Sequence, residues 1–133
     1  MGKRIAALAL AGALGMGFIG AGAAPASASG GNDVIREGSC SGTSDWKLKL
    51  SEENGALEVE FEVDQNVVGD VWKVQLLRNG ERFFQGRATT VAPSGSFEVR
   101  QVIADPAGPD TVRAIAKNPA TGEVCRGTAT SDF

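Results

Sequence analysis

The stretch "ALEVEFEVD", residues 56–64, alternates apolar and acidic side chains at every second position. Successive side chains of a β-strand point to opposite faces, whereas a helix would distribute both kinds around its circumference. The period of two therefore predicts a strand that buries one set of side chains and exposes Glu58, Glu60 and Glu62. A chain with this stretch must build a sheet that has one face covered.

The run "DWKLKLS", residues 45–51, alternates in the same way, and "SEENG" between the two runs has the composition of a turn. We expect a hairpin that places Lys49 opposite Glu58 and Lys47 opposite Glu60. Opposite charges that face each other across two strands are mildly stabilising. The acidic stripe is therefore predicted to be a solvated, salt-paired sheet face.

Asn79-Gly80 joins two further β-rich runs, which predicts a two-residue type I′ hairpin. In this hairpin Phe83 is expected to face inward opposite Leu76, and Phe84 to point outward beside Gln75. Other alternating runs lie near residues 34–40, 96–103, 112–116 and 124–125. About seven or eight short strands without a helix predict an all-β antiparallel sandwich or a small barrel.

The first 28 residues have the order of a secretory signal peptide: basic Lys3 and Arg4, an apolar run over 5–19, and an A-x-A site ending at Ala28. We expect cleavage after Ala28, a flexible tail over 29–33, a sandwich domain over 34–133, and a secreted protein. The apolar run is shorter than the roughly 20 residues that cross a bilayer, so no membrane span is expected.

The chain has two cysteines, Cys40 and Cys125, near the two ends of the predicted domain. In an exported protein this predicts one structural disulfide. The net charge of the whole chain is −3, and it becomes −5 once Lys3 and Arg4 are removed. This charge argues against nucleic acid and anionic membrane surfaces as partners.

The chain contains no histidine and no tyrosine, which removes the Ser-His-Asp and Cys-His nucleophile sets and most zinc sites. Paired carboxylates remain available for glycoside hydrolysis, but those at Glu58, Glu60 and Glu62 are predicted to lie on an open face bordered by lysines. A catalytic acid needs a partly desolvated cleft to raise its pKa. We therefore expect the protein not to be an enzyme.

The run "FEVDQNVVGDVW", residues 61–72, partly matches a calcium-binding loop. Asp64 and Asn66 supply oxygen ligands at the first and third positions, but Val68 at the fifth and Gln75 at the twelfth lack the side chains that an EF-hand requires. One interpretation is a looser Ca²⁺ site that uses Asp64, Asn66, Asp70 and backbone carbonyls. The other is a polar loop between two strands, and no other cofactor is predicted.

An outward Phe84 would lie among Arg82, Lys73 and Gln75, which gives a candidate ligand patch. The alternative is a face that the N-terminal segment covers. Trp46 and Trp72 fall on the inward phases of their strands. They are therefore expected in the core rather than on a sugar-binding platform.

The tryptophan at 72 and the segment "DTVRAIA" at 110–116 resemble the immunoglobulin-type sandwich, in which an Asp precedes the second-to-last strand. That resemblance implies the fold, although the usual bridge joins two central strands and the corner Tyr is replaced near Arg113 or Ala114. The neocarzinostatin-type apoproteins, which are secreted sandwiches that hold a small molecule, are similar in size and origin.

The motifs "CSG-x-S-x-WKLK", "VEFEVDQN", "GDVWKVQLLRNG", "APSGSFEVR" and "TGEVCRGTAT" resemble small secreted actinobacterial proteins of unknown function. In those proteins an oxygen-bearing residue often stands where this chain has Val68. We expect a monomeric, non-catalytic module that binds an extracellular protein, a cell-wall component or a small ligand. The alternatives are a small-ligand carrier with a pocket near Phe84 and Trp72, and a calcium-stabilised structural module.

Overall fold

The computed structural model describes residues 32–133, so the predicted signal peptide and residues 29–31 of the predicted tail lie outside the described residues. The described part contains eight strands: β3 (Val34–Ser39), β4 (Asp45–Glu53), β5 (Ala56–Asp64), β6 (Val71–Arg78), β7 (Glu81–Thr89), β8 (Ser96–Ala104), β9 (Asp110–Lys117) and β10 (Val124–Ser131).

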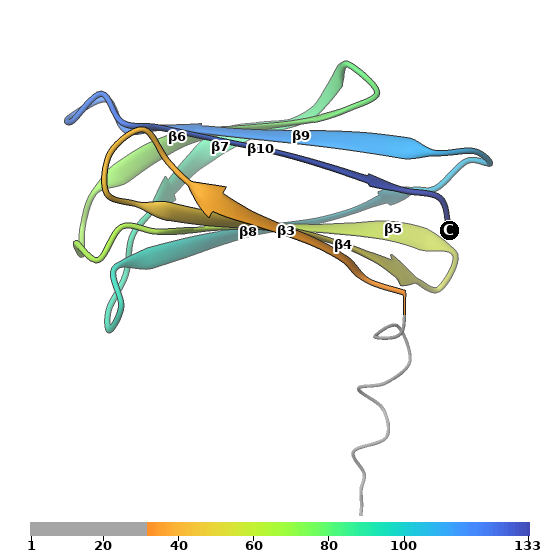
Figure 1. The fold of residues 1–133 in the computed structure, drawn as a ribbon, viewed down its shortest axis with the longest axis horizontal. Helices are drawn as coiled ribbons and strands as arrows, with labels where there is room; N and C mark the ends of the chain where they lie inside the picture. Colours follow the sequence, from red (N-terminus) through yellow and green to blue (C-terminus); the bar gives the residue numbers. More distant parts are fainter. Residues whose placement is uncertain (1–31) are drawn as a thin grey trace, which may run out of the picture. The chain divides into compact units, whose positions relative to one another are not determined.

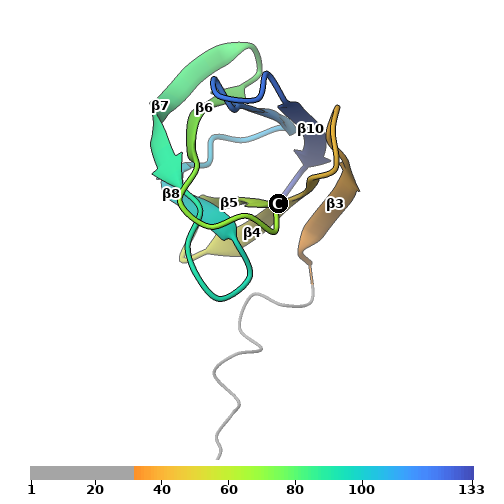
Figure 2. The ribbon, with the colours of Figure 1, turned by 90° about the vertical axis from the view of Figure 1, so that its left-hand side faces the viewer.

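The strands form two antiparallel sheets, with the orders β10-β9-β6-β7 and β3-β4-β5-β8. The sheets lie over each other as two layers (Figure 1) and close around the interior when viewed along the strands (Figure 2). The first sheet has the G-F-C-C′ order of an immunoglobulin-type sandwich. In the second, β4, β5 and β8 correspond to A, B and E, with β3 added outside A. The predicted all-β sandwich is confirmed.

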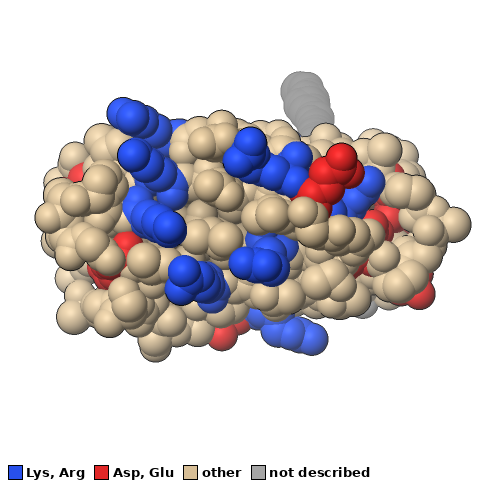
Figure 3. Space-filling model, turned by 90° about the horizontal axis from the view of Figure 1, so that it is seen from above, with Lys and Arg blue, Asp and Glu red and all other residues tan. Residues whose placement is uncertain are grey.

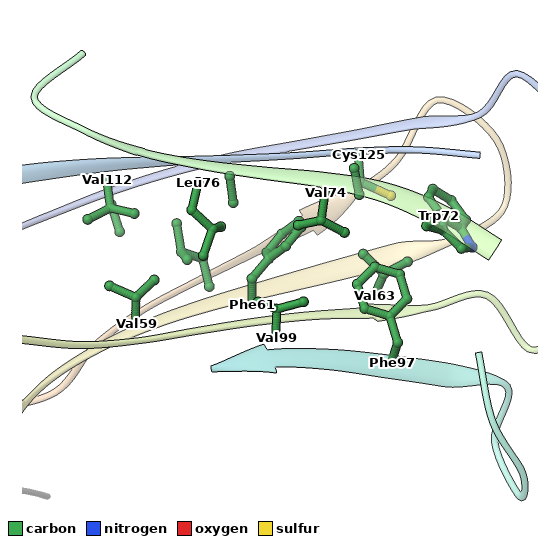
Figure 4. Close-up of a cluster of buried hydrophobic side chains, with 14 of the residues drawn as sticks. Val59, Phe61, Val63, Trp72, Val74, Leu76, Phe97, Val99, Val112 and Cys125 are labelled. Atoms are coloured by element: carbon green, nitrogen blue, oxygen red, sulfur yellow. The ribbon is translucent and has the colours of Figure 1, made fainter. Parts of the chain in front are cut away.

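The core consists of the alternate apolar residues that each sheet turns toward the other (Figure 4). Trp72 is completely buried, and its ring centroid lies 6.0 Å from that of Phe97. Trp46 is partly buried against the same core. The inward placement predicted for both tryptophans is therefore correct.

Trp46 lies between two glycines of different sheets. A Cβ at Gly38 of β3 would lie 2.8 Å from the indole, and one at Gly127 of β10 would lie 2.5 Å from it. Real Cβ atoms do not approach other atoms so closely, so both positions require glycine, which has no side chain. The two glycines let a large ring fit between the edge strands of the two sheets.

The β4–β5 hairpin is tighter than predicted. Its turn is Asn54-Gly55, with φ angles of 53° and 81°, as in a type I′ turn. Lys49 therefore lies opposite Glu60, and Lys47 opposite Glu62. The predicted pairs were wrong by two residues, but a two-residue shift leaves every side chain on its expected face.

The prediction for Phe84 was wrong. A bulge between Leu76 and Leu77 makes Phe83 the extra residue of β7 and pairs Phe84 with Leu76, so Phe84 faces inward. A Cβ on Gly86 would lie 2.9 Å from the Phe84 ring, which shows how closely the ring covers that position. Both phenylalanines are partly buried against the core.

The predicted disulfide between Cys40 and Cys125 is confirmed, with a Cα–Cα distance of 4.3 Å. Cys40 follows the last residue of β3, and Cys125 lies in β10. The bond therefore connects the end of β3 to β10, and these two strands belong to different sheets.

We expect the double variant Cys40→Ser, Cys125→Ser to have a lower free energy of unfolding by about 4–5 kcal/mol, the value of the chain-entropy model for a loop of this length. The bond closes 85 residues of separation. Urea unfolding of the variant measures the loss, and the reduced wild-type protein should show the same midpoint. An unchanged midpoint would mean that the bond does not constrain the unfolded chain.

Candidate functional site

The outer face of the sheet β10-β9-β6-β7 has an unusual charge. Its inward residues are in the core, so the intervening residues point to solvent. No acidic residue occupies an outward position of these four strands, and six basic residues do: Lys73, Arg82, Arg87, Arg113, Lys117 and Arg126. We call this surface the basic face. Figure 3 looks down on it and shows Lys and Arg side chains spread across its length.

Three of these cations stand in one row across three strands. Lys73 of β6 lies directly opposite Lys117 of β9 on one side and Arg87 of β7 on the other. Neighbouring strands are about 4.8 Å apart, and like charges directly opposite each other destabilise a sheet. We call this row the cationic ladder.

No carboxylate within the described residues neutralises the basic face. The ion pairs of residues 32–133 use Lys49, Arg78 and Arg100, and none of them includes a cation of this face. Each of the six side chains is exposed. Their donors are therefore available to a ligand.

A shallow groove of about 430 Å³ lies at the cationic ladder. Its lining includes the ladder itself, together with Gln75, Gln85 and Ile115 of the next row. Gln75 lies directly opposite Gln85, so two amide groups flank each other beside the cations. Lys and Arg donate charge-assisted hydrogen bonds to anionic oxygens, and amides add neutral donors and acceptors. The groove thus has the chemistry of an anion-binding site.

The outer face of the other sheet is mainly acidic. It carries Glu37, Asp45, Glu53, Glu58, Glu60, Glu62, Asp64 and Glu98 beside Lys47, Lys49 and Arg100. Arg100 pairs with Glu58, and its Nη2 lies 2.9 Å from Glu53 Oε1. Burial, followed by the charge of Glu58, raises the pKa of Glu60 against the opposing effect of Lys49. The two faces of the sandwich therefore have opposite charge.

The structure separates the predicted ligand patch. Lys73 and Gln75 line the groove, and Arg82 lies farther along the same face, opposite Leu77. Phe84 faces the core, so it does not share a surface with the other three residues.

Sequence reasoning missed the four other outward-facing residues of the groove: Gln85, Arg87, Ile115 and Lys117. Alternation in "DTVRAIAK" does place Arg113, Ile115 and Lys117 on one face of a strand. The sequence does not say that this strand lies beside β6.

The candidate calcium loop is held by side-chain hydrogen bonds within the protein. Asp70 Oδ2 accepts from Gln65 Nε2 at 2.7 Å and from Asn118 Nδ2 at 2.9 Å. Gln65 Oε1 in turn accepts from the buried Trp72 Nε1 at 3.0 Å, and Thr90 Oγ1 accepts from the Asp70 amide at 3.0 Å. Hydrogen bonds from Gln65 and then Asn118 hold the pKa of Asp70 below its usual value.

The other two candidate ligands lie in different surroundings. Asp64 is exposed at the end of β5, opposite Asp45, and Asn66 is an exposed loop residue with a φ of 62°. Among residues 32–133 there is no group of three or more His, Cys, Asp or Glu side chains that could hold a metal ion. The arrangement gives Asp70 a structural role, and calcium binding stays a prediction.

Within the described part of the chain, the structure has no helix long and apolar enough to cross a membrane. Comparison of the chain with protein-family models, curated proteins and solved structures found no match. A function for this chain must therefore be inferred from the chemistry of its own surface.

We expect Lys73→Thr to raise the free energy of unfolding by about 0.2–1 kcal/mol, because it removes both like-charge contacts of the ladder. Urea unfolding at low salt measures this gain, which should shrink in 1 M NaCl, where charges are screened over about 3 Å.

The matched control is Lys47→Thr, because Lys47 lies between Glu37 and Glu62 on the other sheet. This variant should lose stability at low salt. A gain at Lys73 that does not depend on salt would show that the ladder carries no electrostatic strain.

We expect Asp70→Asn to destabilise the protein at neutral pH, because a neutral amide oxygen accepts the hydrogen bonds from Gln65 and Asn118 more weakly than the charged carboxylate oxygen does. The lowered pKa of Asp70 means that its carboxylate stabilises the fold above its usual value of 3.8 and loses this effect as the pH falls further. The difference between variant and wild type should therefore diminish in acid. Melting curves from pH 7 to pH 2 measure it, with the exposed Asp64→Asn as control; a difference independent of pH would contradict this role.

Proposed function

We propose that this protein is an exported, non-catalytic binding module that holds an anionic ligand on its basic face. The observation that carries the proposal is the cationic ladder: Lys117, Lys73 and Arg87 lie side by side with no carboxylate among the described residues to neutralise them. Natural sequences break a local stability rule mainly where a function compensates for it. An anion on the ladder would relieve the repulsion.

The groove supports the same proposal. It adds Gln75 and Gln85 to the three cations, so a bound oxyanion would meet both charged and neutral donors. Arg presents a planar fork of donors that suits carboxylate, sulfate and phosphate groups, while Lys adds a mobile point charge. These residue types bind and orient an anion, and the groove lining contains no carboxylate or thiol to act as base or nucleophile.

The disulfide supports the exported location, because such bonds persist mainly in oxidising compartments. The predicted signal peptide also supports an exported location. The resemblance to small secreted sandwiches, made at the level of sequence motifs, also agrees with a binding role outside the cell.

Titration with a sulfated heparin disaccharide, followed by backbone amide NMR shifts, tests the proposal. We expect the shifts to concentrate at the groove residues. Hydrogen bonds to charged groups contribute about 1.5–3 kcal/mol, so Lys73→Gln with Arg87→Gln should weaken binding by about tenfold or more.

The control variant is Arg36→Gln with Lys47→Gln, which changes the net charge equally but lies on the other sheet. It should bind like the wild type. Shifts that fall elsewhere, or that survive the ladder substitutions unchanged, would contradict an anion site on the basic face.

A further inference from the structure

The basic face carries a second pair of cations beyond the groove. Arg113 of β9 and Arg82 of β7 lie on either side of Leu77 of β6. We call them the distal pair. Arg113 is four residues from Lys117 on the same strand, which puts the distal pair about 13 Å from the cationic ladder. One sulfate, phosphate or carboxylate group cannot reach both rows.

Polar groups connect the two rows of cations. The row between them consists of Arg126, Ile115, Gln75 and Gln85 across the four strands. A ligand that left the ladder toward the distal pair would therefore cross one more cation and two amides, which hydrogen-bond hydroxyl groups as well as anionic ones. Groups that can bind a ligand therefore continue along the face over a length that suits an extended molecule.

We propose that the ligand is a linear anionic polysaccharide that lies along the strands and contacts the cationic ladder and the distal pair at once. This inference rests on the proposed anion binding of the basic face and adds the length and class of the ligand. Linking two anionic groups makes the second contact intramolecular, which can raise avidity by roughly 10²–10⁴. Contacts with the cationic ladder and with the distal pair that are each weak can then together give high affinity.

The face suits a saccharide chain better than a nucleic acid. Proteins that bind single-stranded nucleic acid stack the bases on aromatic side chains. The outward positions of β6, β7, β9 and β10 contain no aromatic residue. Hydroxyl-bearing units with acidic groups need only the cations and amides that are present.

An anionic bilayer is also a poorer fit. Exposed valines occur in two adjacent loops at one end of the sandwich: Val67 and Val68 at 49% and 55% exposure, and Val91 at 56%. Insertion of that end would bring lipid headgroups near the ladder but leave the distal pair about 13 Å farther away. Membrane-surface segments also rely on Trp, Phe and Leu, which these loop positions lack.

A second copy of the chain is the remaining candidate, because its acidic face has the opposite charge. Part of the negative charge on that side is already neutralised. Arg100 pairs with Glu53 and Glu58, and Lys49 pairs with Asp33. Basic-to-acidic stacking would also be heterologous, so it would continue into an open chain of molecules rather than a closed dimer.

Calorimetric titration at physiological salt with a heparin disaccharide and a heparin octasaccharide tests the inference. The wild type should bind the octasaccharide at least about tenfold more tightly. Arg82→Gln with Arg113→Gln should remove most of that advantage and leave disaccharide binding unchanged. Lys73→Gln with Arg87→Gln should weaken the binding of both saccharides, and Arg36→Gln with Lys47→Gln should weaken neither. Equal melting temperatures will show that the variants are folded.

The outcomes separate the two proposals. If both saccharides bind equally and the distal pair has no effect, the polysaccharide proposal is overturned and the anion site stands. If neither saccharide binds, both proposals fail. Tighter binding to a single-stranded oligonucleotide, binding only to phosphatidylserine vesicles, or concentration-dependent self-association abolished by charge reversal on either face would each overturn the polysaccharide as the ligand.

Discussion

The burial of alternate residues on β6 is the constraint on which the rest of the structure depends. Trp72, Val74 and Leu76 are almost completely excluded from solvent, so Lys73 and Gln75 between them must point outward. A slip of one residue would drive a lysine into the core, which fixes the register of β6 against both of its neighbours. The same apolar packing that stabilises the sandwich thus aligns the cations of its outer face.

This alignment brings like charges together, and the stability of the core offsets their repulsion. On the acidic sheet, opposite charges face each other across neighbouring strands, as Lys49 faces Glu60, and this follows the usual rule for exposed strands. The cationic ladder breaks that rule within the same small domain. A disulfide between the end of β3 and β10, together with the apolar core, supplies stability that offsets the uncompensated charge of one face. The division of charge between the faces gives this small sandwich the surface that we propose holds an anion.

Local patterns predicted the strands well because burial alternates with a period that can be read directly from the residues. The inward tryptophans followed from the same kind of reasoning, whereas the Cys40–Cys125 bond followed from there being only two cysteines. Two details were wrong for a physical reason: the β4–β5 turn and the bulge at Leu76 are set by backbone geometry within hairpins. The first error shifted partners without changing faces, whereas the second moved Phe84 from the surface to the core.

The sequence by itself determined which residues alternate, which runs form strands, and which cysteines pair, because each of these depends on local pattern or on there being only two cysteines. The Asn79-Gly80 turn predicted that β6 pairs with β7, but only the tertiary structure decided that β9 lies on the other side of β6, since the pairing of distant segments depends on how they pack together. That order placed Lys73 beside Lys117 and Arg87. Net charge is a sum over the chain and suggested an acidic protein, but recognition depends on where the charges lie, and folding gathered six cations on one face.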